Sequence, residues 1–395
     1  MVLTHKTTHK TTRKTAKSIN TNSEDTIIRD INLENDYQKL ENTEDNKNEN
    51  INKYGKTFVI GESLKNPDLR YDRLKYHLQQ YGLVESNNPN VNHIFGILNY
   101  KFYDTKFYLV NNFQFIESFK DKFSLHSNLK RYFPIHYNKT YPKSFMLSYD
   151  TKYNTIKDKL YIARPIEGEG GKDITIINSP ELLEKAKEYI PKYSNGISLT
   201  EYVQNPMLYK GKKMHLRCYF MITLIDNVFN SYLLDGGGIY TANLPYKNSD
   251  FTNKGIHDTH FSSSGGAYFF PEGLYNNTQP KISNYNDFMK VYNNLCDCLI
   301  YVSKIAVSSI QQYQNAQNTY EIYGIDVMVR DDFTVFIIEI NARYVGYAGF
   351  SDYKPINDKY FDWIDKVVLQ PCIGKKNVQQ ISGPTTPIYT AKLVQ

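Results

Sequence analysis

The stretch YGIDVMVRDDFTVFIIEINAR, residues Tyr323 to Arg343, decides the fold because it contains two strands and the turn between them. Val335 to Ile340 is rich in β-branched and aromatic residues, which is typical of a buried strand. Ile325 to Val329 has the same character and predicts the partner strand. The polar residues that begin at Arg330 supply turn chemistry, so the stretch predicts a β-hairpin.

Three polar side chains interrupt this apolar hairpin: Asp326, Glu339 and Asn341. Side chains alternate along a strand, so Glu339 and Asn341 share a face, and folding at the turn brings Asp326 close to Glu339. A buried ionised carboxylate is costly unless a positive charge compensates it. Carboxylate and amide oxygens suit a hard cation, so we predict a magnesium site here.

The composition of the 395-residue chain is globular, with 41% hydrophobic and 22% charged residues. No apolar run is long enough to span a membrane, and the N-terminus lacks the apolar stretch of a signal peptide. The 4 cysteines are too few and too scattered for a disulfide framework. We expect a cytoplasmic monomer without a membrane segment. The high content of Asn, Lys and Tyr indicates an AT-rich genome, such as that of a protist or of a large virus infecting one. If the protein is viral, we expect it in the cytoplasm of the host.

The net charge of the chain is +6, and the N-terminal tail has the most unusual composition. Residues 1–53 consist mainly of Thr, Lys, Asn and Glu, which predicts a disordered tail. A solubilising role is the simplest interpretation of its basic start, and we do not expect nucleic-acid binding. Residues 54–149 predict a small α/β domain, 150–369 a larger one, and 370–395 a loosely held tail.

A glycine-rich loop, RPIEGEGGKDI, joins two predicted strands between Arg164 and Ile174. Its glycines Gly168, Gly170 and Gly171 let the backbone approach a phosphate and offer N–H donors to it. Glycine-rich hairpin turns are common, so an ordinary turn is an equal alternative. No Gly-Lys-Ser/Thr follows, which excludes a P-loop.

Two further segments carry polar patterns. SLTEYVQNP, residues 198–206, resembles a hinge whose backbone meets a purine edge. GKKMHLRCYFMIT, residues 211–223, places Lys213, His215 and Arg217 on one face of a strand. Three cationic groups in a row suit a polyphosphate, although a solvated strand face fits the alternation equally well.

The order of these motifs, from about Asn111 to Leu369, resembles the tubulin–tyrosine ligase family of the ATP-grasp superfamily. The resemblance implies an α+β fold, with two α/β subdomains enclosing a nucleotide after a small α/β N-terminal domain. It implies an ATP- and Mg²⁺-dependent ligase that activates a carboxylate as an acyl phosphate. A free amino acid then attacks, and an amide forms on a protein or peptide acceptor, with tubulin as one candidate.

The resemblance also implies individual roles. Asp326, Glu339 and Asn341 match the magnesium ligands, and Arg217 matches the catalytic arginine at the γ-phosphate. The remaining matched positions are cofactor-binding (Arg164, Gly168, Gly170, Gly171, Lys172, Glu201, Tyr202, Val203, Lys213 and His215) or substrate-binding (Lys122, Asn253 and Lys254).

The chain departs from the family pattern at five positions. Arg164 replaces a lysine, His215 an aspartate, and Asp173 a glycine, which puts a negative charge near the expected phosphates. Asp235 and Tyr240 stand where the family carries arginines that grip the amino acid, so we expect a changed acceptor pocket.

Three alternatives stay open. One is an inactive relative that binds a nucleotide or a partner protein. Another is a ligase for small peptides or small molecules. The third is a metal cluster formed by His257, Asp258 and His260.

Overall fold

The computed structural model describes residues 57–60, 72–86, 93–95, 107–111, 122–137, 141–166, 171–260, 267–309, 316–341, 354–373 and 386–392. All of these belong to one compact unit, Lys47–Gln395. The predicted disordered tail, residues 1–53, lies outside the described residues. None of the helices in the described ranges is both long enough and apolar enough to cross a membrane.

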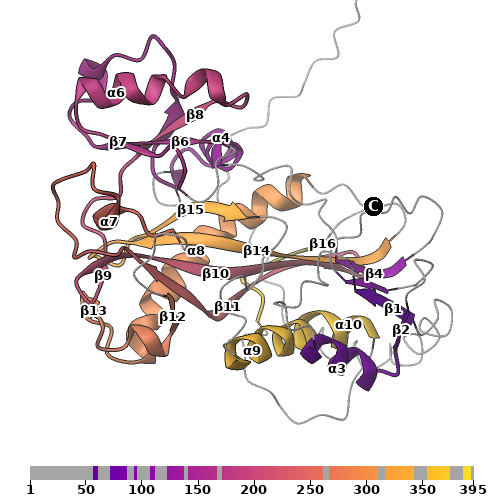
Figure 1. Ribbon diagram of the computed structural model, residues 1–395. Helices are drawn as coiled ribbons and strands as arrows, with labels where there is room; N and C mark the ends of the chain where they lie inside the picture. The colour runs from indigo at the N-terminus through magenta and orange to yellow at the C-terminus, as the bar shows by residue number, and fades with distance from the viewer. Residues whose placement is uncertain are drawn as a thin grey trace, which may run out of the picture. The chain divides into compact units, whose positions relative to one another are not determined.

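A large mixed sheet forms the centre of the molecule (Figure 1). Its middle is the antiparallel set β11-β10-β14-β15, and β4, β3, β1 and β2 extend it beyond β14. Its described strands are β1 (Thr57–Ile60), β2 (Val84–Glu85), β3 (His93–Phe95), β4 (Phe107–Asn111), β9 (Leu208–Tyr209), β10 (Lys212–Ile225), β11 (Val228–Thr241), β12 (Ala267–Phe270), β13 (Thr278–Gln279), β14 (Ala316–Val329), β15 (Val335–Asn341) and β16 (Tyr389–Lys392).

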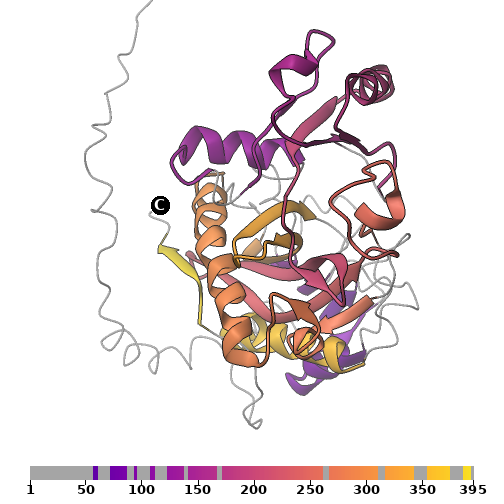
Figure 2. The same cartoon turned by 90° about the vertical axis from the view of Figure 1, so that its left-hand side faces the viewer.

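Helices cover both faces of this sheet (Figure 2). On one face, α8 (Tyr285–Ser309) packs Leu295 and Leu299 against Cys218 and Phe220 of β10. On the other face, α3 (Asp72–Gln80) and α9 (Lys354–Ile364) pack against Tyr219 and its neighbours. The two sets come from alternate positions of β10, as the period of a strand requires.

A second, four-stranded sheet stands apart from the large one in Figure 1, in the order β5-β8-β6-β7. Its strands are β5 (Ser144–Met146), β6 (Tyr161–Pro165), β7 (Thr175–Ile177) and β8 (Ile197–Glu201). Helix α6 (Pro180–Lys187) covers it and buries Leu183 and Ala186. Ser179 caps this helix, because its side chain accepts a hydrogen bond from the Leu182 N–H.

The other described helices are short or flank these layers. They are α4 (Lys122–Tyr132), α7 (Lys254–His257), α10 (Gln370–Ile373), a π-helical segment (Asp365–Leu369) and three 3₁₀ turns (Tyr153–Thr155, Ile190–Lys192 and Glu272–Leu274).

Three strand pairings concern the predicted domain organisation. A separate N-terminal α/β domain is not confirmed, because β4 pairs in parallel with β14 and so joins the large sheet. Strand β5 belongs instead to the four-stranded sheet. Part of the C-terminal segment also joins the large sheet, since β16 pairs with residues Val228 to Ser231 of β11.

Candidate functional site

The β14–β15 hairpin brings its three polar side chains together, as predicted. Asp326 lies opposite Glu339 in the register of the two strands, next to an irregularity between Asp326 and Val327. Asn341 Nδ2 donates a hydrogen bond of 3.3 Å to Asp326 Oδ2. Turn formation is local, with Phe333 in the left-handed region at φ 64°.

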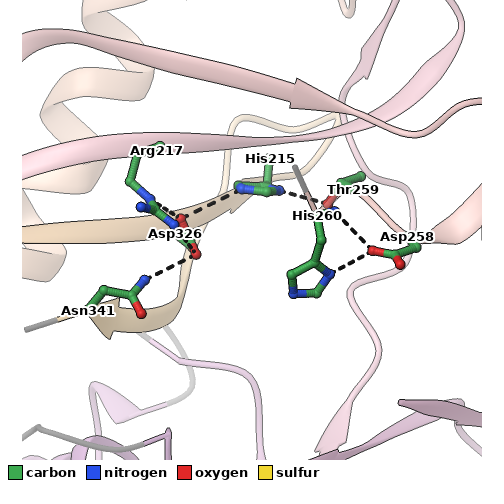
Figure 3. Close-up of polar contacts among 7 residues, drawn as sticks. All are labelled: His215, Arg217, Asp258, Thr259, His260, Asp326 and Asn341. Carbon is green, nitrogen blue, oxygen red and sulfur yellow. Dashed lines mark hydrogen bonds and ion pairs between the residues drawn. The ribbon is translucent and has the colours of Figure 1, made fainter. Parts of the chain in front are cut away.

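Arg217 compensates the buried charge of Asp326 (Figure 3). The two residues are directly opposite in the β10–β14 register. Arg217 Nε and Nη2 donate to the two carboxylate oxygens at 2.5 and 3.0 Å. Burial alone would raise the pKa of Asp326, but the charge and the hydrogen bonds of Arg217 lower it well below its usual range. The carboxylate therefore stays ionised at neutral pH.

His215 lies between this ion pair and a loop that follows α7. Its Nε2 is 3.6 Å from Asp326 Oδ1, and its Nδ1 shares a 2.7 Å hydrogen bond with Thr259 Oγ1. Tyr240 stacks on its ring with centroids 5.0 Å apart. Burial lowers the pKa of His215 to about 4, so the imidazole is neutral at physiological pH.

Lys213, the third residue on this face of β10, is buried. Its Nζ donates to Tyr202 Oη at 2.9 Å and lies 4.2 Å from the centroid of that ring. Tyr202 Oη in turn is 3.0 Å from His257 Nδ1. Burial lowers the pKa of Lys213 to about 7. The predicted alternation is confirmed, since Met214, Leu216 and Cys218 enter the core on the opposite face.

A cavity of about 220 Å³ separates the two sheets at this point. It brings together many of the residues predicted for the site: Arg164, Gly171, Lys172, Lys213, His215, Lys254, Asp326 and Glu339. Arg164 is 5% exposed and donates to Tyr141 Oη at 3.1 Å. Its Nε has no hydrogen-bond partner among the described residues, so the buried guanidinium retains an unmet donor at the cavity.

The end of the glycine loop closes one side of the cavity. Gly168 and Gly170 lie outside the described residues, whereas Gly171 has φ 73°. Asp173 also adopts the left-handed region, at φ 56°, which is the conformation that glycine favours. Tyr193 Oη donates to its carboxylate at 2.8 Å, and Asp173 is not among the cavity-lining residues. The carboxylate of Asp173, expected beside the phosphates, therefore accepts a hydrogen bond from Tyr193 and does not line the cavity.

The predicted hinge lines a second cavity, of about 470 Å³. Glu201, Tyr202 and Val203 all border it. Lys159 Nζ forms a 2.5 Å ion pair with Glu201. Tyr202 connects the two cavities, because it borders the second one and accepts a hydrogen bond from Lys213, which lines the first.

The three predicted substrate residues have separate environments. Lys254 begins α7 and lines the first cavity. Asn253 caps α7 by accepting a hydrogen bond from the Gly255 N–H. Lys122 begins α4, but its side chain lies outside the described residues.

The donor set fits a hard divalent cation better than a transition metal. Asp326, Glu339 and Asn341 offer only oxygen ligands, which Mg²⁺ prefers. Within the described ranges, no group of three His, Cys, Asp or Glu side chains is arranged to hold a metal. The alternative His257 cluster is wrong in particular, because His257 turns to Tyr202 while His260 turns to Asp258.

Motif order did not predict the partnership of Asp258 with His260. His260 Nδ1 lies 2.6 Å from Asp258 Oδ1, and the His260 N–H donates to the same oxygen at 2.9 Å. Both side chains line the first cavity. The only signal was the spacing His-Asp-Thr-His, which also fitted a metal cluster.

Two sheets enclosing a cavity of this kind are consistent with the ATP-grasp class of folds. Comparison with known families agrees: the model of the "Tubulin-tyrosine ligase family" matches residues 89–343. The chain therefore belongs to the tubulin-tyrosine ligase family.

Named relatives in this family are more distant. The chain is 26% identical over 277 residues to "Tubulin glycylase 3C" of Tetrahymena thermophila, covering 64% of this chain and 25% of the relative. It is 22% identical over 347 residues to "Tubulin polyglutamylase TTLL6" of Mus musculus, covering 78% and 39%. It is 23% identical over 195 residues to "Probable tubulin polyglutamylase ttll-9" of Caenorhabditis elegans, covering 47% and 46%. The chain thus spans a quarter to about half of these relatives' lengths.

Proposed function

We propose that this protein is an ATP- and Mg²⁺-dependent ligase that joins the amino group of an amino acid to a protein carboxylate. One observation carries the proposal: the hairpin carboxylates Asp326 and Glu339 line a cavity between two sheets that is also lined by the basic side chains of Arg164, Lys172 and Lys213. Membership of the tubulin-tyrosine ligase family supports the reaction class.

The residues that line the cavity and those beside it have separate tasks in this scheme. Bound magnesium would neutralise phosphate charge, and Asp326, Glu339 and Asn341 would hold it. Arg164 lines the cavity and would contribute the positive charge of its guanidinium to the binding of phosphate oxygens. Arg217, released from part of its pairing with Asp326, would stabilise negative charge on the group in transfer. The hinge Glu201–Val203 would bind the base through its backbone.

Tubulin is the first acceptor to test, because the named relatives are a tubulin glycylase and tubulin polyglutamylases. The amino-acid pocket differs from the family pattern. Asp235 forms a 2.8 Å ion pair with Lys359, and Tyr240 stacks on His215. A positive charge is therefore present near this position, but it belongs to Lys359 of α9, which is already paired with Asp235. Glycine, glutamate and tyrosine should each be offered as the donor.

The inactive-relative alternative is less favoured, since an inactive protein has no need of the full set of oxygen ligands beside Arg217. The small-molecule ligase remains a prediction that the same assay tests. Cytoplasmic location and the monomeric state also stay predictions.

The test uses the full chain with ATP, Mg²⁺, tubulin and one labelled amino acid at a time. Label should enter the tubulin band, and ADP should appear in equal amount. Glu339→Gln should abolish both products, whereas Asp331→Asn, at an exposed aspartate in the turn of the same hairpin, should not. A protein that binds Mg²⁺–ATP but transfers no label to tubulin or to any acidic peptide offered would refute the ligase proposal.

A further inference from the structure

The loop that follows α7 places a carboxylate–imidazole pair, Asp258 and His260, in the cavity. Figure 3 shows this pair on the opposite side of His215 from Arg217. We propose that His260 is a catalytic residue, the general base that takes a proton from the incoming amino group, and that Asp258 positions it. This inference rests on the proposed ligase function.

Asp258 fixes both the backbone and the ring of His260. Its Oδ1 accepts the His260 N–H at 2.9 Å and lies 2.6 Å from His260 Nδ1. The Asp258 side chain is only 14% exposed, whereas that of His260 is 39% exposed. With Nδ1 holding the hydrogen shared with Asp258, Nε2 becomes the basic nitrogen of the ring. A carboxylate that orients an imidazole in this way is the arrangement used for general-base catalysis.

The backbone at Gly171, the described end of the glycine loop, fits closely against this pair. A Cβ added to Gly171 would lie 2.8 Å from His260 Nδ1 and 3.0 Å from Asp258 Oδ2. Gly171 and Lys172 line the same cavity as Asp326 and Glu339. His260 is thus held between the loop expected to cover the phosphates and the strands expected to hold the metal. A reacting acyl phosphate would lie in this space.

Among the residues that the structure describes, the other titratable groups that line the cavity are already committed. His215 has both ring nitrogens engaged, with Nδ1 bonded to Thr259 at 2.7 Å and Nε2 3.6 Å from Asp326. His257 is engaged by Tyr202 and by the Ser249 carbonyl. Lys213 Nζ donates to Tyr202, and a bound phosphate would keep it protonated. Asp326 is paired with Arg217. The remaining charged groups facing the cavity are cationic or are assigned to the metal: Arg164, Lys172, Lys185, Lys254 and Glu339.

The chemistry needs such a base. An amino acid arrives as an ammonium ion, which has no lone pair for attack. His260 Nε2 accepts one proton, the amine nitrogen forms the C–N bond, and the C–O bond to phosphate breaks. The phosphate leaves with the electron pair of that bond and carries away the second amine proton as hydrogen phosphate. The products are the amide, phosphate and the proton on His260.

Hydroxylamine separates this step from the earlier ones, because its amino group is unprotonated at neutral pH and traps an acyl phosphate without a base. Tubulin, ATP and Mg²⁺ are incubated with either the amino acid that the wild-type chain transfers or hydroxylamine. His260→Gln should slow amide formation by about 10²-fold or more, the usual contribution of a general base, and leave hydroxamate formation within about threefold. His136→Gln, the same substitution at a ring stacked on Tyr301, is the matched control.

The pH profile tests the positioning residue. Asp258→Asn keeps a hydrogen-bond acceptor but removes the carboxylate charge beside the ring, so the midpoint of the rise of the amide-forming rate with pH should shift. A merely structural contact would leave this midpoint unchanged. This variant also carries the test if His260→Gln does not fold. Equal slowing of amide and hydroxamate formation, or slowing of neither, would overturn the assignment of His260. Absence of hydroxamate with the wild-type chain would instead refute the ligase itself.

Discussion

Replacing Lys213 with methionine should change the pH dependence of folding. The side chain is buried, with 5% of the residue exposed, and burial lowers its pKa from 10.5 to about 7. The unfolded chain therefore binds one more proton than the folded chain between these two values. The free energy of unfolding must therefore rise with pH between these two pKa values. Below about pH 7, the buried Lys213 destabilises the folded chain the most.

The magnitude follows from the two pKa values. Linkage predicts that the cost of burying Lys213 falls by about 2 kcal/mol between about pH 7 and about pH 9. Lys213→Met removes this term, so its stabilising effect should be larger at the lower pH by that amount. Contributions that do not depend on pH, such as lost contacts with the Tyr202 ring, cancel in the comparison.

Urea unfolding of both proteins at the two pH values measures this difference from the transition midpoints and slopes. Lys247→Met, at an exposed lysine, is the control and should show no such change. A stability difference between Lys213→Met and the wild-type chain that is the same at both pH values would refute the reasoning. It would mean that Lys213 stays fully protonated in its contact with Tyr202.

Three further results follow from the geometry. Glu339→Gln should abolish Mg²⁺-dependent ATP turnover while circular dichroism stays unchanged; normal turnover would exclude a metal role. Gly237→Ala should cost about 3 kcal/mol or more in thermal unfolding, because its Cβ would lie 2.1 Å from the Arg217 carbonyl. Asp362→Asn should cost about 2 kcal/mol near neutral pH, since Asp362 bonds Arg73 and His77 at 2.7 and 2.6 Å. The pKa of Asp362 is lowered despite its burial, so this loss should shrink in acid titrations as pH falls through that pKa.

The sequence predicted those parts of the fold that depend on local periodicity. Alternation along β10 placed Lys213, His215 and Arg217 on one face, and turn chemistry placed Asp326 opposite Glu339. Pairing between distant segments has no such local signal. The parallel contact of β4 with β14 and the addition of β16 to β11 both join segments far apart in the chain. A sequence pattern alone therefore predicts a separate N-terminal domain and a loose tail, because neither long-range pairing leaves a local signal.

The same distinction holds for the site. Asp173 lies near the end of the glycine loop, so its charge was expected at the phosphates, yet the hydroxyl of Tyr193, 20 residues further along the chain, donates a hydrogen bond to it. The roles of Asp258 and His260 depend on how the loop after α7 folds back on Gly171. Residue order indicates which groups are present, whereas the orientation of each side chain depends on partners that the order does not reveal.

The ion pair of Arg217 with Asp326 links folding to the proposed chemistry. Removing either partner leaves a buried charge unpaired, which destabilises the hairpin as well as the site. Loss of activity in such variants therefore cannot be assigned to catalysis without a stability measurement. Asn341 offers a cleaner probe, because it donates one 3.3 Å hydrogen bond and carries no charge. If Asn341→Ala weakens Mg²⁺–ATP binding at unchanged stability, the effect belongs to the site rather than to the fold.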